Sequence, residues 1–220
     1  MNRSASQRYH ATVSSAFDLF LIRHGLTDWN ETGRLLGRVD IGLNARGRAE
    51  AEAMAQALSD FPLRAVAVSP QRRTQETAQS IAQPHGLPIR TEPGLDEVWV
   101  QESWLGKTWK ELQGDPDLEE YLRDPYHRCA AIEPATAVQE RVIAAAERLR
   151  AEGDGPMLLI SHGDPIKLLL AHYLSMELSA FRRIAVSTAS LSVLRFSPRA
   201  GSRLLVMNWK PPGAIRQFLD

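Results

Sequence analysis

An arginine and a histidine follow a short apolar run near the start of the chain. Leu19-Phe20-Leu21-Ile22 is too short for a helix and is typical of a buried strand, and Arg23-His24-Gly25 follows with no polar transition. Burying a cation and an imidazole without partners is costly. Ligands of open α/β sheets bind at the carboxyl ends of strands. We therefore expect His24 to be reactive and Arg23 to hold an anion, the alternative being a strand that simply ends in solvent.

Two further predicted strands end in residues of the same kind. Residues 65–68 lead into Ser69-Pro70-Gln71-Arg72-Arg73, and residues 157–160 lead into Ser161-His162-Gly163. If the strands are parallel, the three ends meet at one edge of the sheet and bring two imidazoles and two or three guanidiniums together. Guanidinium groups match phosphate oxygens, and clustered cations should lower the pKa of a histidine and keep its lone pair free. This arrangement is suited to chemistry on a phosphate group.

Strand and helix patterns alternate along most of the chain. The predicted helices cover residues 45–58, 72–83, 135–152 and a segment after residue 164, and the further strands cover 65–68, 87–90, 157–160, 188–196 and 203–208. Asn44 and Asp164 are the expected N-caps, with Pro165 in the first helical position. Such alternation implies a parallel sheet with crossover helices. We therefore predict an α/β fold, a three-layer α/β/α sandwich around a mostly parallel sheet.

The segment over residues 92–134 interrupts this alternation. It contains four prolines and three tryptophans, Trp99, Trp104 and Trp109. We expect short helices and loops that form a small cap insertion over one face, because a loop-rich insertion of this length is more often functional than idle. The tryptophans could pack the cap onto the body or shape a substrate pocket, and the sequence leaves both readings open.

Length and composition suit one domain of this kind. The chain has 220 residues, 44% of them hydrophobic, so residues 16–220 can form a single domain, while the polar, Ser-rich residues 1–15 predict a disordered tail without the apolar stretch of a secretory signal. Twenty-six basic residues balance 26 acidic ones, and no apolar run approaches the ~20 residues that span a bilayer. We expect neither nucleic acid nor a membrane as a partner. Cys129 is the only cysteine, which excludes an intrachain disulfide and fits a cytoplasmic setting.

These motifs resemble the signatures of one enzyme family. Leu21-Ile22-Arg23-His24-Gly25, followed by Thr27, Trp29 and Asn30, is similar to the first motif of the histidine phosphatase superfamily, in its phosphoglycerate-mutase-like branch. Residues 69–78, with Ser69-Pro70, Arg73 and Thr77-Ala78, are similar to the family's Ser-Pro-x-x-Arg-x-x-x-Thr-Ala. Leu95-Asp96-Glu97 resembles the family's acid, and Ser161-His162-Gly163 resembles its second histidine. The motifs stand in the family's order over residues 17–175, and together they are far more specific than any one alone.

The resemblance implies a role for each matched residue. His24 would attack phosphorus and become a phosphohistidine, and Glu97 would protonate the leaving oxygen and then deprotonate the attacking water. Arg23, Arg73 and His162 would bind the three transferring oxygens. The expected substrate and phosphate contacts are Arg23, Thr27, Asn30, Arg73, His162 and Gly163. The cationic side chains would supply the charge that a metal brings, so the resemblance implies neither a metal nor another cofactor.

Some of these assignments have an alternative in the sequence. The Arg-x-x-x-Thr-Ala spacing selects Arg73 over Arg72, whereas Glu97 has a competitor in Glu102 as the acid. His162-x-Asp164 could in principle ligate a metal, but no His-x-His or His-Glu-x-x-His motif accompanies it, and a cap explains the aspartate. A non-catalytic phosphate-binding module is the other class, although it would lack the nucleophile or the acid, and no matched position is missing.

The residues after the acid bear on whether water or a second hydroxyl accepts the phosphoryl group. Val98-Trp99-Val100-Gln101 stands where the family's mutases usually carry Arg-His-Tyr-Gly, so a basic residue for a second charged group is absent. This favours a phosphatase acting on a small phosphorylated metabolite, with a phosphoglycerate-mutase-type phosphomutase as the alternative. Glu102-Ser103-Trp104-Leu105-Gly106 and Ile132-Glu133-Pro134 depart from the family's cap motifs, which leaves open a sugar phosphate, a ribazole phosphate or phosphoserine. A homodimer through the sheet edge is one possible assembly.

Overall fold

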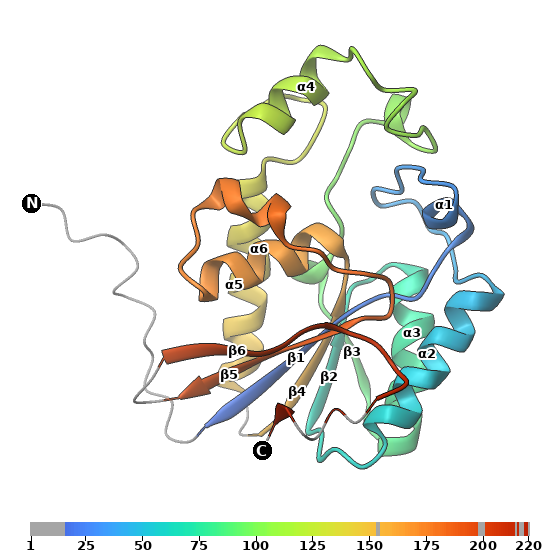
Figure 1. Cartoon of the computed structure of the whole chain (residues 1–220), viewed down its shortest axis with the longest axis vertical. Helices are drawn as coiled ribbons and strands as arrows, with labels where there is room; N and C mark the ends of the chain where they lie inside the picture. Colours follow the sequence, from blue (N-terminus) through green and yellow to red (C-terminus); the bar gives the residue numbers. More distant parts are fainter. Residues whose placement is uncertain (1–15, 153–154, 198–200, 214, 216–217, 220) are drawn as a thin grey trace, which may run out of the picture.

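The computed structural model describes residues 16–152, 155–197, 201–213, 215 and 218–219. Residues 1–15, for which the sequence predicts a disordered tail, lie outside the described part of the chain. In Figure 1 a sheet with helices on both sides forms the lower part of the molecule, and shorter helices and loops rise above it.

A six-stranded sheet with the order β3-β2-β4-β1-β5-β6 forms the middle layer of this lower part (Figure 1). Its strands are β1 (Phe17–Arg23), β2 (Ala65–Val68), β3 (Ile89–Thr91), β4 (Met157–Ser161), β5 (Leu191–Ser197) and β6 (Gly201–Trp209). The first four pair in parallel, whereas β5 and β6 are antiparallel to their neighbours. All residues of β4 are buried, as expected for a central strand with both faces covered. The prediction of a mostly parallel sheet is confirmed.

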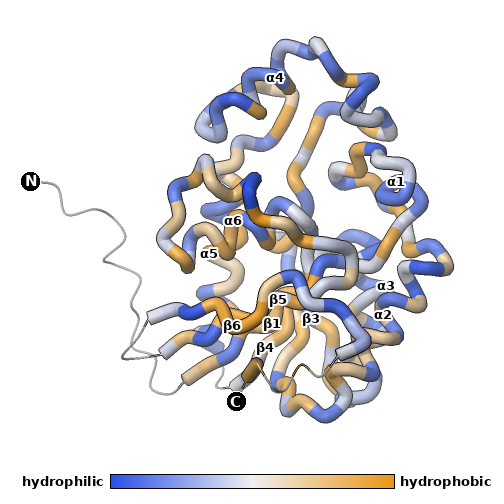
Figure 2. The backbone as a smooth tube through the Cα atoms, in the orientation of Figure 1, coloured by the Kyte–Doolittle hydropathy of each residue, from blue (hydrophilic) through white to orange (hydrophobic). Residues whose placement is uncertain are grey.

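Helices cover both faces of this sheet. α2 (Ala45–Leu58) and α3 (Arg72–Ala82) lie on one face, and α5 (Ala135–Ala151) and α6 (Gly163–Tyr173) lie on the other. Side chains of β1 alternate between these layers: Leu19 and Leu21 pack under α5 and α6, while Phe20 and Ile22 pack under α2 and α3. Figure 2 shows that hydrophobic positions gather in the strands. The predicted three-layer α/β/α architecture is confirmed.

The start of α6 differs from the prediction. His162, and not Asp164, occupies the N-cap position, and the helix begins at Gly163. Pro165 is therefore the third helical residue, where a missing N–H removes no bond within the helix. Asp164 instead accepts a hydrogen bond from Lys167 Nζ at 2.9 Å. The predicted cap was wrong because a proline fits any position of the first turn, so its presence did not fix the helix start.

Two other segments also differ from the prediction. β5 begins at Leu191 rather than at residue 188, because Ala189 has a left-handed φ of +47°, which an extended strand does not accommodate. The segment after His24 contains the short helix α1 (Asp28–Glu31), which is not among the predicted helices. Its N-cap Thr27 accepts a hydrogen bond from the backbone N–H of Asn30, so both residues belong to one helical turn.

Residues 92–134 rise above the sheet as short helices and loops (Figure 1). They contain η3 (Pro93–Leu95), η4 (Glu102–Trp104) and α4 (Pro116–Arg123). Trp104 is buried and its indole N–H donates to Asp115 at 2.9 Å, whereas Trp99 and Trp109 are 42% and 54% exposed. A hydrophobic cluster joins Trp104 and Leu118 to α5, α6 and η5 (Leu178–Arg183). Trp104 therefore packs this segment onto the body of the molecule.

A remaining short helix, η2 (Gln83–His85), connects α3 to β3. Among the helices that the structure describes, none has the length and apolar content needed to cross a lipid bilayer.

Candidate active site

Parallel pairing of β1 with β4 places two histidines side by side. Arg23 and Ser161 are opposite each other in the register, so His24 and His162 follow at neighbouring strand ends. The backbone N–H of His24 donates to the carbonyl of Ser161 at 3.0 Å. The centroids of the two imidazole rings are 5.2 Å apart, and both side chains are buried. The strand ends therefore meet as the sequence predicts.

His24 is held with one ring nitrogen available for chemistry. Its Nδ1 lies 2.8 Å from the carbonyl oxygen of Gly25, and because a carbonyl can only accept, Nδ1 carries the proton and Nε2 keeps a lone pair. Burial, followed by the charges of Arg73 and Arg23, holds the pKa of His24 well below its ordinary value. The ring is therefore neutral near pH 7, as nucleophilic attack requires.

The turn after His24 depends on close contact between two backbones. A Cβ on Gly25 would lie 2.5 Å from the carbonyl oxygen of Gly47 in α2, and a Cβ on Gly47 would overlap the carbonyl oxygen of Leu26. Glycine at both positions allows this approach. The contact fixes the segment that carries His24 against the start of α2.

The buried Arg73 and the partly buried Arg23 flank the histidines with some of their donors unused. Arg73 in α3 donates Nη1–H to the carbonyl of Val39 and Nη2–H to that of Gly37, each at 2.8 Å. Arg23 donates Nη1–H to the carbonyl of Val186 at 2.8 Å. The Nε atom of each guanidinium is buried and has no hydrogen-bond partner among the described residues. Buried donors without partners are rare in proteins, and two of them on guanidiniums that both act on His24 and His162 indicate a site for an anion.

His162 belongs to a buried chain of hydrogen bonds. Ser69 Oγ donates to Asp96 Oδ1 at 3.2 Å and, with its only hydrogen used there, accepts from His162 Nε2 at 2.7 Å. Nδ1 of His162 is buried and has no partner in the described part of the chain. Burial and the surrounding cations hold the pKa of His162 well below its ordinary value, and a bound anion would favour a proton on Nδ1. Ser161 takes no part, since its hydroxyl donates to the carbonyl of Leu95 at 2.6 Å.

Glu97, rather than Glu102, lies at this cluster. Its side chain is 19% exposed, and its Oε2 is 3.8 Å from His162 Nδ1. Burial and then the nearby Asp164 raise the pKa of Glu97 to about 7, while Arg73 opposes the shift. Glu102 is exposed and lies outside the lining of the pocket beside Glu97. A carboxyl group that titrates near neutral pH can both give and take a proton.

Three residues to which the sequence assigned no role hold the backbone around Glu97. Arg141 of α5 donates to the carbonyls of Asp96 at 2.7 Å and Glu97 at 3.1 Å, and Arg38 donates to the carbonyl of Glu97 at 2.9 Å. Glu133 binds both guanidiniums, at 2.8 Å from Arg141 Nε and 2.9 Å from Arg38 Nη2. Arg38 and Arg141 are 59 and 44 residues from Glu97, so no local pattern could have connected them.

A pocket of about 340 Å³ opens beside Glu97. Its wall includes Arg23, Asn30, Gly163, Asp164 and Lys167 together with the apolar or aromatic residues Leu36, Val98, Val100, Trp109, Tyr121 and Ile132. His24, Arg73 and His162 are buried and do not line it, so the pocket ends at Arg23 and Glu97. The exposed Trp109 thus borders the pocket, whereas the buried Trp104 does not.

Thr27, a predicted phosphate contact, and Arg72, the alternative to Arg73, do not line this pocket. Thr27 is fully buried, and its hydroxyl donates to Asn30 Oδ1 at 2.9 Å, so it orients a side chain that lines the wall. Arg72 points to the surface, where its Nε binds Glu76 Oε1 at 2.7 Å. Arg73, as the motif spacing predicts, is therefore the arginine that α3 contributes to the site.

A buried histidine close to two arginines and a second histidine is typical of a known family. The model of the histidine phosphatase superfamily (branch 1) matches residues 19–210. This chain belongs to that superfamily. The resemblance drawn from the four sequence motifs is confirmed.

Individual histidine phosphatases resemble the chain over most of its length. An acid phosphatase of Mycobacterium tuberculosis is 31% identical over 182 residues, which cover 81% of this chain and 86% of that protein. Phosphoserine phosphatase 1 of Hydrogenobacter thermophilus is 29% identical, with 82% and 87% covered. The crystal structure of the alpha-ribazole phosphatase of Shigella flexneri has a TM-score of 0.80 and 25% sequence identity, with 90% and 98% covered. The names of the last two relatives refer to different phosphate esters.

Proposed function

We propose that this chain hydrolyses a small phosphomonoester through a phosphohistidine on His24. One observation carries the proposal: Nε of Arg23, Nε of Arg73 and Nδ1 of His162 are buried beside His24 without partners among the described residues. A transferring phosphoryl group presents three equatorial oxygens, and fixed cationic donors stabilise the charge on them. The three nitrogen atoms supply one such donor for each oxygen once phosphate binding protonates the imidazole.

In the first step, Nε2 of His24 attacks phosphorus and the bond to the ester oxygen breaks. The leaving oxygen takes the proton of Glu97, whose pKa of about 7 keeps a large share of it protonated at neutral pH. The ring of His24 gains positive charge, and its Nδ1–H bond to the carbonyl of Gly25 strengthens as it does so.

In the second step, water attacks phosphorus and Glu97 takes its proton. The nitrogen–phosphorus bond breaks, inorganic phosphate leaves and His24 returns to its neutral form. The backbone carbonyl bonds from Arg38 and Arg141 keep the carboxyl group near the reacting atoms in both steps.

The pocket wall favours a leaving group without a second phosphate. Val98, Val100 and Ile132 line the wall near Glu97, and the charge of Lys167 is compensated by Asp164 at 2.9 Å. Arg34 also lines the wall, and its Nη1–H is already donated to the carbonyl of Gly106 at 2.6 Å. A mutase needs a cation to hold the second charged group of its substrate. The relatives named as phosphatases support transfer to water.

The domain organisation, the partner and the location predicted from the sequence are part of this proposal. Residues 16–220 act as one catalytic domain whose segment 92–134 selects the substrate. The absence of a strong net charge and the single cysteine support a small metabolite as the partner and the cytoplasm as the location. A homodimer remains a prediction.

A panel of phosphate esters tests the proposal. Purified protein is mixed with p-nitrophenyl phosphate, phosphoserine, a ribazole phosphate and 3-phosphoglycerate, and release of inorganic phosphate is compared with isomerisation. We expect release, and we expect His24→Ala to abolish it. Equal turnover by the His24→Ala variant would exclude the nucleophile, and isomerisation of 3-phosphoglycerate faster than phosphate release would make the chain a mutase. Tight phosphate binding without turnover of any ester would instead indicate a non-catalytic binding module.

A further inference from the structure

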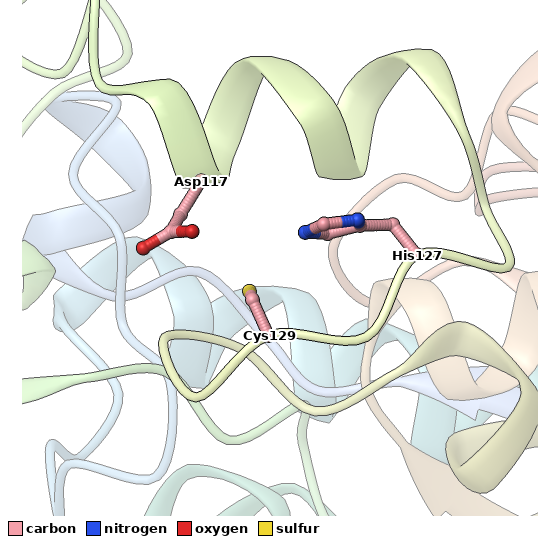
Figure 3. A group of neighbouring side chains, drawn as sticks. All are labelled: Asp117, His127 and Cys129. Atoms are coloured by element: carbon pink, nitrogen blue, oxygen red, sulfur yellow. The ribbon is translucent and has the colours of Figure 1, made fainter.

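Three side chains that the phosphatase chemistry does not use converge in the cap. Asp117 comes from the first turn of α4, and His127 and Cys129 come from the loop that follows this helix (Figure 3). A carboxylate oxygen, an imidazole nitrogen and the thiol sulfur all lie within 4.8 Å of one another. None of the three lines the pocket beside Glu97.

The loop brings these residues together by turning back under α4. Asp124 follows the last residue of the helix, and it accepts hydrogen bonds from the N–H groups of Tyr126 at 2.9 Å and His127 at 3.1 Å. The chain then runs beneath the helix, and Figure 3 shows Cys129 below the space between the other two side chains. Residues separated by 12 positions thus face one another across the loop.

The ring of His127 provides an independent sign of a ligand. Its Nε2 is buried and has no hydrogen-bond partner in the described part of the chain, although its neighbours include a carboxylate and a thiol. A catalytic triad of cysteine, histidine and aspartate is the alternative interpretation of these residues. In such a triad the histidine lies between the nucleophile and the acid and uses one ring nitrogen for each. Here one atom from each of three residues approaches the others, which is the arrangement of ligands around a single ion.

We propose that Asp117, His127 and Cys129 bind one zinc ion. Zinc takes thiolate, imidazole and carboxylate ligands in tetrahedral geometry, whereas the sulfur ligand disfavours magnesium and calcium. Bonds of about 2.0–2.3 Å place tetrahedral ligands roughly 3.5 Å apart. The three atoms lie within 4.8 Å of one another, so the side chains have to move closer together when the ion binds. Cys129 releases its proton to solvent on binding, and water takes the fourth position.

The ion would hold the loop after α4 against the helix, because Asp117 belongs to α4 and the other two ligands belong to the loop. The segment continues from Cys129 into Ala131 and Ile132, whose side chains belong to the hydrophobic cluster that holds the cap, and Ile132 also lines the pocket. Zinc binding therefore should stabilise the cap without contributing to the reaction at His24. The inference does not depend on the proposed phosphatase activity.

Cobalt provides a direct test because Cys129 is the only cysteine of the chain. The full-length protein is freed of metal with a chelator and titrated with Co²⁺, then with Zn²⁺ as competitor. We expect one ion per chain, a thiolate-to-cobalt charge-transfer band that zinc removes, and a melting temperature that rises by several degrees with zinc. Absence of the charge-transfer band at saturating cobalt would overturn the proposal.

Matched variants locate the ion. Cys129→Ser and His127→Ala should remove the tight zinc binding and the rise in melting temperature, and Asp117→Asn should weaken both. His85→Ala is the control, because His85 Nε2 is also buried without a described partner but lies far along the chain in η2. A zinc-dependent rise that survives in Cys129→Ser, or that disappears in His85→Ala, would assign the ion elsewhere. Circular dichroism of the metal-free variants separates loss of the site from loss of the fold.

Discussion

Oε2 of Glu97 lies 3.8 Å from Nδ1 of His162, and the two groups have pKa values shifted in opposite directions. Burial raises the pKa of the carboxyl group to about 7 and lowers that of the imidazole well below its ordinary value. Near pH 7 and with no anion bound, the imidazole is thus neutral and the carboxyl group is about half protonated, and the arrival of phosphate favours a proton on the imidazole. A site that moves a proton needs paired groups of this kind.

The pH dependence of activity should report on Glu97. With a pKa of about 7 the carboxyl group loses its proton as pH rises, so kcat/KM for an alkyl phosphate such as phosphoserine should fall above pH 7. In Glu97→Gln this decline should disappear, and kcat/KM should drop by about 10²–10⁴-fold. For p-nitrophenyl phosphate the drop should be much smaller, because its leaving group needs no proton. An equal loss with both esters would exclude Glu97 as the acid, and Glu102→Gln serves as the control.

Glu97 should also make stability depend on pH. The folded-state pKa of about 7 lies above the value in the unfolded chain, so the folded protein is penalised only when the carboxyl group is ionised. This contribution is fully favourable below the unfolded pKa and is lost as pH rises through about 7. Glu97→Gln should therefore increase the free energy of unfolding by on the order of 2 kcal/mol at pH 8 and by little at pH 4. Urea titrations at both pH values measure this, and a gain of the same size at both would contradict it.

The neighbours Arg72 and Arg73 form a natural pair of variants. Arg73 is buried and donates to the carbonyls of Gly37 and Val39, so Arg73→Ala should lower kcat/KM by about 10³-fold and weaken inhibition by inorganic phosphate. Arg73→Lys should restore little, since an ammonium group lacks the fork of the guanidinium. Arg72→Ala should stay within twofold of the parent, because its side chain is exposed and pairs with Glu76 at the surface. A large effect of Arg72→Ala would reverse the assignment.

The sequence predicted the parts of the site that depend on strand order. Apolar runs ending in Arg23-His24 and in Ser161-His162 identify strands by composition, and parallel pairing then leaves little freedom for where their ends lie. The prediction of Asp164 as the N-cap of α6 was wrong, because several sequences tolerate the backbone angles that begin a helix. The predicted start of β5 was wrong because of Ala189, whose left-handed φ is imposed by the turn that leads into the strand.

The sequence could not predict contacts made across the cap. Asp96 and Glu97 take their positions from Arg38, Glu133 and Arg141, which approach from three separate segments. Hydrophobic periodicity carries no information on such contacts, because the guanidinium groups bind backbone carbonyls, which every residue possesses. The convergence of His127 and Cys129 with Asp117 was missed for a related reason, since it depends on a turn that no motif marks.

Arg141 should act on activity through the position of Glu97. Arg141→Ala removes hydrogen bonds to the carbonyls of Asp96 and Glu97, and a displacement of the carboxyl group by about 1 Å can lower kcat by roughly 10²-fold. We expect KM to change little, because Arg141 does not line the pocket, and the decline of activity above pH 7 to become weaker. The control is Arg150→Ala on the same helix, which loses an ion pair with Glu147 away from the site. Steady-state kinetics over pH 5–9 compare the two variants. An equal effect on kcat in both would mean that Arg141 stabilises α5 and does not position Glu97.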